Sequence, residues 1–247
     1  MENSENKVVI DIKDLKKSFG DQVVLDGINL MLHEKENLVI LGKSGTGKSV
    51  LIKCIVNLLQ HDSGSITVGK HELTNINEED LIKVRQKIGF LFQGAALYDS
   101  MTVRENLTFA LSRLREKFTA EEIDSKIIEA LENVSLPDSI DKMPSELSGG
   151  MKKRIGLART LVVHPQIILY DEPTTGLDPI TSDEISDLIN ETRDKFKNSS
   201  IIITHDIKCV KTVADRIIML KDGKVYKDGS LEEFVNDSDP FIKSFFK

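Results

Sequence analysis

One eight-residue segment restricts the fold of this chain more than any other. It fits the pattern G-x-x-x-x-G-K-[ST] and consists of Gly42, Lys43, Ser44, Gly45, Thr46, Gly47, Lys48 and Ser49. An apolar run at residues 38–41 precedes it and a helix-like run at residues 50–55 follows it, which is the context that this pattern requires. The sequence therefore predicts a strand, a tight loop and a helix in direct succession.

The residue types in this loop suit phosphate groups. Glycines let the backbone turn tightly and bring its N–H groups against phosphate oxygens, and the helix N-terminus near Val50 adds a positive field. We expect Lys48 to reach the β- and γ-phosphates of a nucleotide and the Ser49 hydroxyl to be a ligand of Mg²⁺. The alternative is a glycine- and serine-rich turn that binds nothing, and the strand and helix in register argue against it.

Composition describes an ordinary globular chain. Of its 247 residues, 40% are hydrophobic and 30% are charged, which is enough for a large core. The net charge of -7 argues against a general nucleic-acid surface, because neutralising phosphates needs a basic face. Apolar runs stay well below the roughly 18 residues of a membrane-spanning helix. Any membrane role is therefore expected to come through a partner.

The cysteines and the N-terminus indicate a compartment. Cys54 and Cys209 lie far apart, outside any C-x-x-C pattern, so neither a metal site nor a disulfide framework is predicted. We expect two buried thiols in a reducing compartment. Residues 1–6 are polar and acidic, unlike the basic and then apolar start of a secretory signal.

Periodicity predicts an α/β chain interrupted by a helical stretch. Strands are expected at residues 8–15, 23–25, 28–32, 38–41, 64–69, 88–92, 167–170, 201–203, 216–220 and 224–226, and helices at 77–85 and 183–196. The glycines at 20 and 27 divide the first three strands. From about residue 102 to 163 apolar residues recur at helical spacing, namely Val103, Leu107, Leu111 and Leu114, then Ile123, Ile127, Ile128, Leu131 and Val134.

An acidic pair, Asp171 and Glu172, follows the apolar run at residues 167–170. Open α/β sheets bind ligands at the carboxyl ends of their strands, so the pair lies beside the phosphate loop if the two strands are neighbours. Asp171 is then expected to hold Mg²⁺ through water, and Glu172 to orient or deprotonate an attacking water. Acidic residues that merely favour a helix dipole are the alternative, and the phosphate loop in the same chain argues against it.

A second candidate anion site lies at residues 148–150. Ser148, Gly149 and Gly150 precede the basic helical stretch at residues 151–159, where free N–H groups suit a phosphate. Ser148 as a simple N-cap is the alternative. Two such sites would crowd one nucleotide, so we expect this one to act on a nucleotide held by a second copy of the chain.

In this order the motifs resemble those of the ATPase subunits of ATP-binding cassette (ABC) transporters, over nearly the whole chain. Residues 42–49 resemble the family's Walker A motif, residues 147–151 its signature, and residues 167–171 its Walker B motif with Glu172 as the catalytic carboxylate. Gln93 resembles the Q-loop glutamine and His205 the switch histidine.

Two further positions carry the resemblance. Asp178, in the segment 176–178, resembles the family's D-loop aspartate, and Phe19 resembles the aromatic residue that stacks on adenine. The resemblance thus implies a catalytic set of Lys48, Gln93, Glu172 and His205, and Mg²⁺ ligands at Ser49, Gln93 and Asp171. Nucleotide contacts are implied at residues 42–50, at 148–150, and at Phe19 and Asp178.

The fold that this resemblance implies is a P-loop NTPase core of the α/β class: a RecA-like parallel sheet with helices on both sides, an antiparallel β lead-in and an inserted helical subdomain. We expect one ABC ATPase domain over residues 1–247. Its core covers about 1–92 and 164–230, its helical subdomain about 93–163, and its C-terminal tail about 231–247.

One departure narrows the resemblance. The signature ordinarily ends in Gln, whereas this chain has Met151, followed by Lys152, Lys153 and Arg154. This variant and the sequences of residues 92–103 and 168–179 are similar to those of the MlaF-like ATPases of Mla/Mce-type lipid transport systems. These systems move phospholipid or sterol-like molecules between envelope membranes. Catalysis is expected to be unaffected, since Ser148 and backbone N–H groups meet the nucleotide.

The resemblance implies a Mg²⁺-dependent ATPase, with ATP and Mg²⁺ as cofactors, that forms a head-to-tail homodimer. Its expected partners are an integral membrane permease subunit and substrate-binding lipid-carrier subunits, without nucleic acid. It is expected in the cytoplasm, peripheral on the cytoplasmic face of the inner membrane. The alternatives are the ATPase of an importer or exporter of another small solute, a soluble ABC ATPase acting on nucleic acid or the ribosome, and a nucleotide-gated regulatory module.

Overall fold

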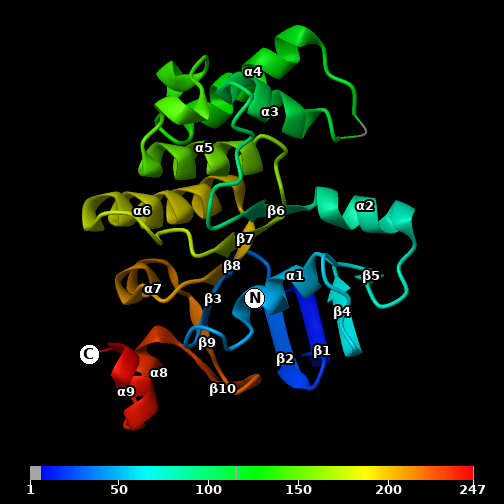
Figure 1. The fold of residues 1–247 in the computed structure, drawn as a ribbon, viewed down its shortest axis with the longest axis vertical. Helices are drawn as coiled ribbons and strands as arrows, with labels where there is room; N and C mark the ends of the chain where they lie inside the picture. Colours follow the sequence, from blue (N-terminus) through cyan, green and yellow to red (C-terminus); the bar gives the residue numbers. More distant parts are fainter. Residues whose placement is uncertain (1–6, 115, 247) are drawn as a thin grey trace, which may run out of the picture.

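Two β-sheets and their covering helices make up the computed structural model, which describes residues 7–114 and 116–246 (Figure 1). The larger sheet has six strands in the order β10-β9-β3-β8-β7-β6. These are β3 (Asn37–Leu41), β6 (Ile88–Leu91), β7 (Ile167–Asp171), β8 (Ser199–Ile203), β9 (Arg216–Lys221) and β10 (Lys224–Gly229). Neighbours in it are parallel, except for the antiparallel pair of β9 and β10. Residues 1–6, on which the secretory-signal prediction depends, lie outside the described residues.

The smaller sheet is the antiparallel lead-in, and it differs from the prediction in one place. It consists of β1 (Val8–Phe19), β2 (Gln22–His33), β4 (Ser63–Val68) and β5 (His71–Glu72). The predicted break at residue 27 is wrong, because β2 continues through it. Gly27 has φ 78 and Asp14 opposite has φ 47, and the register of β1 with β2 shifts on both sides of Leu15. This irregularity bends the strand pair without ending it.

The helices begin at caps that the sequence supplies. They are α1 (Lys48–Ile55), α2 (Glu78–Gln86), α3 (Val103–Leu111), α4 (Ala120–Glu132), α5 (Gly149–Leu161), α6 (Pro179–Phe196), α7 (Ile207–Val213), α8 (Leu231–Val235) and α9 (Pro240–Phe246), with 3₁₀ turns at Pro137–Ser139 and Pro144–Glu146. Thr102 and Glu105 form a capping box at α3, and Asn77 caps α2. Such side chains satisfy the free N–H groups of the first turn.

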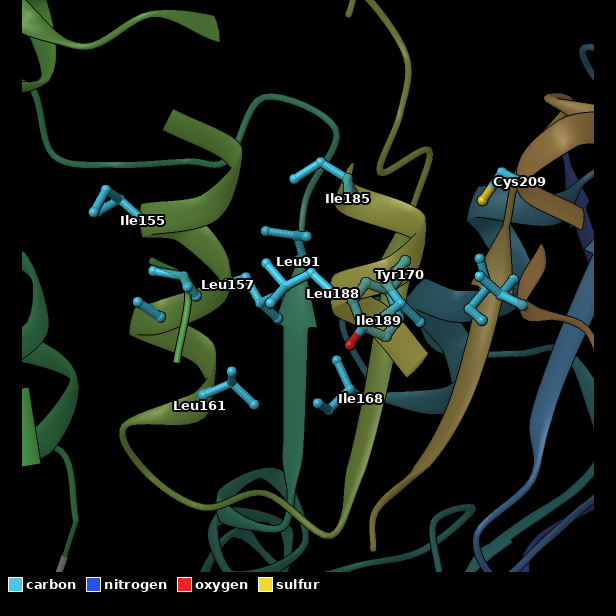
Figure 2. Packing of buried hydrophobic residues seen from close by; sticks show 14 of the residues in the cluster. Leu91, Ile155, Leu157, Leu161, Ile168, Tyr170, Ile185, Leu188, Ile189 and Cys209 are labelled. Carbon is cyan, nitrogen blue, oxygen red and sulfur yellow. The ribbon is translucent and has the colours of Figure 1, made fainter. Parts of the chain in front are cut away.

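The six-stranded sheet is buried on both faces. In β3, Val39 and Leu41 pack into one hydrophobic cluster and Leu38 and Ile40 into another. The first cluster contains residues of α3 to α7, and the second contains residues of the smaller sheet and of α1. Figure 2 shows side chains of α5 and α6 meeting around Leu91 at the end of β6. Burial on both faces explains the continuous apolar runs of these strands.

Helices α3, α4 and α5 gather at one end of the molecule, at the top of Figure 1. The predicted helical periodicity is right for most residues: Val103, Leu107, Leu111, Ile127, Leu131 and Val134 are buried. Ile128 is different, since it is 46% exposed. Adjacent helical residues point about 100° apart, so Ile127 and Ile128 do not share the same face.

Both cysteines are buried and unbonded, as predicted. Burial raises the pKa of the Cys54 thiol to about 11 and that of the Cys209 thiol to about 12. Thiols of this kind are inert, because the thiolate is the reactive form. Within the described part of the chain, every helix is too short or too polar to cross a membrane.

Candidate functional site

The loop between β3 and α1 is shaped by two glycines that leave no room for a side chain. Gly47 precedes α1 with φ 93, and a Cβ atom there would lie 2.8 Å from the carbonyl oxygen of Val24. At Gly42 a Cβ atom would lie 2.7 Å from the carbonyl oxygen of Leu220. The loop therefore lies directly against β2 and β9, an approach that only glycine permits.

Lys48 lies inside this loop. It is only 7% exposed, and its Nζ donates to the carbonyl oxygens of Gly42 at 2.8 Å and Lys43 at 3.0 Å. Burial lowers its pKa, while the carboxylates of Glu172 and Asp171 act in the opposite direction. Because both hydrogen-bond acceptors are neutral, the positive charge is available to an anion in the loop.

A cavity of about 700 Å³ opens above the loop. The sequence-predicted residues that line it are Gly42, Lys43, Ser44, Gly45, Gly47, Lys48, Ser49, Val50, Gln93, Glu172 and His205. The structure therefore brings most of the predicted nucleotide and catalytic residues together. Thr46 instead braces the loop, since its Oγ1 donates to the carbonyl oxygen of Lys43 at 2.9 Å.

The predicted Mg²⁺ ligands also converge. The Ser49 hydroxyl donates to Oδ1 of Asp171 at 3.1 Å, although β8 lies between β3 and β7 in the sheet. The two strands are therefore not neighbours, and the first turn of α1 brings Ser49 to Asp171 instead. Burial raises the pKa of Asp171, and the adjacent Glu172 acts in the same direction.

These donors fit the group that they were predicted to hold. Hydroxyl, carboxylate and amide oxygens are the hard ligands that Mg²⁺ prefers, and it usually keeps several waters and takes others from phosphates. Accordingly, no cluster of three or more His, Cys, Asp or Glu side chains suited to a metal occurs within residues 7–114 and 116–246. A positive ion beside Asp171 and Glu172 offsets the repulsion between the two carboxylates.

Glu172 is held in an unusual conformation. Its φ is 53, in the left-handed region that residues other than glycine rarely adopt. Its Oε2 accepts a hydrogen bond from Thr175 Oγ1 at 3.0 Å and lies 2.8 Å from Nδ1 of His205. Such a backbone costs about 1–3 kcal/mol and persists where its surroundings fix it, often at functional sites. The carboxylate is thereby directed into the cavity.

Four predicted nucleotide contacts lie elsewhere. Ser148 caps α5 by accepting from the Met151 N–H at 3.2 Å, and Asp178 caps α6 by accepting from the N–H groups of Ile180 and Thr181 at 3.1 Å each. Gly150 packs against Thr181, where a Cβ atom would lie 2.4 Å from Cγ2. As far as the described residues show, neither these three nor Gly149 lines the cavity above their own loop.

Phe19 is the least supported assignment. Its ring is 48% exposed, lies under Lys17 Nζ at 5.4 Å, and is not among the residues described as lining the cavity. Val24, in the same small sheet, does line it. Adenine stacking by Phe19 therefore stays a prediction.

Sequence reasoning missed Val24, Ile207, Ser244 and Phe245, which also line the cavity. The last two belong to α9, which also contains the aromatic residues Phe241 and Phe246. They pack on the domain: Lys43 and Lys221 place their Nζ atoms 5.4 and 4.5 Å from the Phe241 ring, and the Phe245 ring lies 5.4 Å beyond it. The tail therefore forms part of the cavity wall.

A glycine loop around a buried lysine, with a hydroxyl–carboxylate pair at the carboxyl edge of a parallel sheet, defines a P-loop nucleoside-triphosphate-binding protein. A family model described as "ABC transporter" matches residues 25–175. The chain belongs to the ABC transporter family. It is one of the family's ATP-binding ATPases, with ATP as its substrate and Mg²⁺ as its cofactor.

Three curated relatives align over almost the whole chain. "Protein TRIGALACTOSYLDIACYLGLYCEROL 3, chloroplastic" of Arabidopsis thaliana is 36% identical over 98% of this chain and 74% of its own length. "Probable ribonucleotide transport ATP-binding protein mkl" of Mycobacterium leprae is 37% identical over 96% and 68%. "Methionine import ATP-binding protein MetN" of Brucella abortus is 35% identical over 97%, but this chain spans only 64% of its length.

Two solved structures have the same fold. One is the dimeric structure of MJ0796, a bacterial ABC transporter cassette, with a TM-score of 0.82 and 31% identity over 90% of this chain and 98% of that one. The other is CbiO1 of Clostridium perfringens, described as part of the CbiONQ transporter complex, with a TM-score of 0.84 and 31% identity over 92% and 90%. The predicted ABC ATPase fold is confirmed.

The position of α9 predicts that it contributes to nucleotide binding. In Phe245→Ala we expect ATP affinity to fall about threefold to tenfold, since losing part of an apolar wall costs on the order of 1 kcal/mol. Titration with a fluorescent ATP analogue measures this. Phe246→Ala is the matched control, because Phe246 packs near Phe234 instead. Equal weakening in both variants would mean that undocking of α9, and not the Phe245 contact, is responsible.

Proposed function

We propose that this chain is the ATP-hydrolysing subunit of an ABC transporter that drives a separate integral membrane permease, from the cytoplasmic face of the inner membrane. The observation that carries this proposal is the cavity in which Lys48, Glu172 and His205 meet. The chain itself has no candidate membrane helix among the described residues, so the path of the cargo is assigned to another subunit.

Hydrolysis in this proposal needs little covalent chemistry from the protein, and positioning supplies most of the rate. Lys48 would bind the β- and γ-phosphates, and Ser49, Asp171 and Gln93 would hold Mg²⁺. When bound, Mg²⁺ neutralises charge on the phosphate oxygens. Glu172 accepts a hydrogen bond from the attacking water and takes its proton at Oε2. His205, next to Oε2, orients that carboxylate and stabilises charge on the γ-phosphate.

The site is proposed to be complete only in a head-to-tail homodimer. Support comes from Ser148, Gly149 and Gly150, which lie at the N-terminus of α5 and outside the cavity that their own chain describes. In the dimer they meet the nucleotide held by the partner, where the N–H groups and dipole of α5 favour the γ-phosphate. ATP binding then closes the dimer and hydrolysis allows it to open. The structural neighbour MJ0796 is itself described as dimeric.

The permease is proposed to dock beside the helical lobe. A second cavity, of about 660 Å³, lies between α2, β6 and α3 and is lined by aromatic residues that include Phe92, Tyr98 and Phe109. Its lining includes Phe92, while the next residue, Gln93, lines the first cavity, so Gln93 is suited to relay nucleotide state to the permease. We retain the division into a core at about 1–92 and 164–230, a helical subdomain at about 93–163 and a tail at about 231–247 as part of this proposal.

The proposed cargo is a phospholipid or a related lipid moved between envelope membranes, with lipid-carrier subunits as further partners. Two observations support a lipid cargo: the signature variant at Met151, and the similarity to the Arabidopsis protein named for a galactolipid. Transport of another small solute is the second candidate, favoured by the nearly equal identity to proteins named for ribonucleotide transport and methionine import.

The role of Glu172 is tested by Glu172→Gln. We expect the variant to bind ATP but to hydrolyse it about 100-fold more slowly or worse, since it loses the general base, and to accumulate closed dimer. Phosphate release and size-exclusion chromatography with ATP measure the two effects. Turnover near that of the wild type would refute the assignment.

The composite site is tested by mixed dimers of Lys48→Ala and Ser148→Arg. If sites form between chains, a dimer of one Lys48→Ala chain and one Ser148→Arg chain has one intact site, made of Lys48 from the second chain and Ser148 from the first. This mixed dimer is expected to hydrolyse ATP. The double variant paired with a wild-type chain then has no intact site and is inactive. Sites formed within one chain would give the opposite pattern, and both homodimers serve as inactive controls.

The transporter assignment is tested by purifying the tagged chain from membranes of its source. We expect an integral membrane protein to co-purify and, once this complex is reconstituted, its ATPase rate to rise with phospholipid but not with methionine or ribonucleotides. Stimulation by one of those solutes alone would favour the second candidate. Purification without any integral membrane protein would contradict a transporter role.

A further inference from the structure

A second buried lysine touches the acidic pair, and the mechanism above does not use it. Lys153 lies in α5, one turn beyond the residues that cap it, and is only 5% exposed. Its Nζ donates to the backbone carbonyl oxygen of Glu172 at 3.1 Å. Lysine is almost never fully buried unless its charge is compensated. Here the carboxylates of Glu172 and Asp171 also act on it electrostatically.

This contact fixes one side of the strained residue. The Glu172 N–H donates to the carbonyl oxygen of Ile203 in β8 at 2.9 Å, and the Glu172 carbonyl oxygen accepts from Lys153. Both backbone polar groups of Glu172 are thus held, on opposite sides of a left-handed φ of 53. A conformation of this kind persists only where the surroundings over-determine it. Lys153 supplies one of these restraints, and the Thr175 N–H donates to the same carbonyl oxygen at 3.3 Å.

Packing alone does not require a charge at this position. Helix α5 is already held in the hydrophobic core by Ile155, Leu157 and Leu161. An uncharged side chain of similar length could fill the same volume, without the cost of burying an ammonium group. The ammonium therefore acts through what it contacts, the peptide group of Glu172.

We propose that Lys153 is a positioning residue that links the signature helix α5 to the Glu172 carboxylate of its own chain. This inference rests on the roles proposed above for Glu172 and Ser148. In the head-to-tail dimer, Ser148 touches the nucleotide held by the partner, while Lys153 sets the carboxylate that acts on the nucleotide of its own chain. One rigid helix thereby connects the two ATP sites of the dimer.

The short distance between Ser148 and Lys153 along α5 makes the connection between the two ATP sites direct. Ser148 and Lys153 are five residues apart, which is about 7.5 Å along a helix at about 1.5 Å per residue. A shift of α5 when its N-terminus engages the partner's nucleotide is therefore carried to the Glu172 peptide without an intervening hinge. Hydrolysis at one site is expected to depend on occupancy of the other, which appears as positive cooperativity in ATP concentration.

The test is Lys153→Met in the full-length dimer, or in the permease complex where the dimer needs it. We expect kcat to fall about tenfold or more, with ATP affinity changed less than about twofold, because the restraint acts on Glu172 and not on the phosphates. The Hill coefficient should fall towards one. Lys153→Arg, which keeps a charged donor, should recover part of kcat. Lys152→Met is the matched control on the same helix and should retain wild-type kcat.

Two comparisons make the result decisive. In a Glu172→Gln background, adding Lys153→Met should cause no further loss, because both changes act through the same group. A wild-type kcat and Hill coefficient in Lys153→Met, alongside an inactive Glu172→Gln, would overturn the inference and leave the proposed function intact. An active Glu172→Gln would instead refute the proposed role of Glu172.

Melting temperature separates positioning from a fold defect. If Lys153→Met does not fold, Lys153→Gln replaces it, since its amide keeps a neutral N–H donor while removing the charge. A fall in kcat at unchanged ATP affinity and near-wild-type melting temperature supports positioning. A parallel loss of melting temperature, ATP affinity and kcat in Lys153→Gln would show that Lys153 serves only the fold, and the inference would be wrong.

Discussion

The ATP site depends on the burial of β3 between two hydrophobic clusters. Because side chains of β3 alternate between the clusters, a slip by one residue would move each set into the cluster packed around the other. Its parallel neighbours β8 and β9 hold it by backbone hydrogen bonds. The loop that follows is fixed in turn, since Gly42 lies against β9 and Gly47 against β2. The position of the phosphate-binding loop is thus set by the core of the protein.

Around this loop, two buried lysines lie near two carboxylates of opposite charge. Lys48 and Lys153 approach Asp171 and Glu172 from α1 and α5 respectively. Among the described residues, both lysines donate to backbone carbonyl oxygens and neither donates to a carboxylate. Removing one partner from such a group leaves an uncompensated charge. The arrangement leaves the carboxylates of Asp171 and Glu172 free for a metal ion, Ser49, His205 and water.

The sequence predicted those features of the structure that depend on a few neighbouring residues. The strand before Gly42, the cap at Ser148 and the buried run before Asp171 each depend on a few neighbouring residues, and the sequence contains them all. Ser49 and Asp171 were each predicted as Mg²⁺ ligands, but their direct contact could not be predicted, because the order of strands in a sheet leaves no trace in any one strand. The contact of α9 with the cavity joins residues about two hundred positions apart, and nothing in the phosphate loop signals it. Ile128 failed because it falls outside the stripe of α4 that contains Ile127, Ala130 and Leu131, which are buried.

The similarity of this chain to its relatives bears on the proposed cargo. Relatives named for a galactolipid, ribonucleotides and methionine are 35% to 37% identical to it over nearly its whole length. If this chain contacted the cargo, proteins named for such different molecules would be expected to differ most at that contact, with one of them standing apart in similarity. Their equal distance is what is expected of a subunit whose shared residues bind ATP. Under the proposed function, any trace of the cargo in this chain is indirect, through the permease, and the proposed docking surface is the aromatic groove that Phe92, Tyr98 and Phe109 help to line. Tyr98 and Phe109, whose rings lie 4.9 Å apart in that groove, are therefore better guides to the transported molecule than any residue of the ATP site.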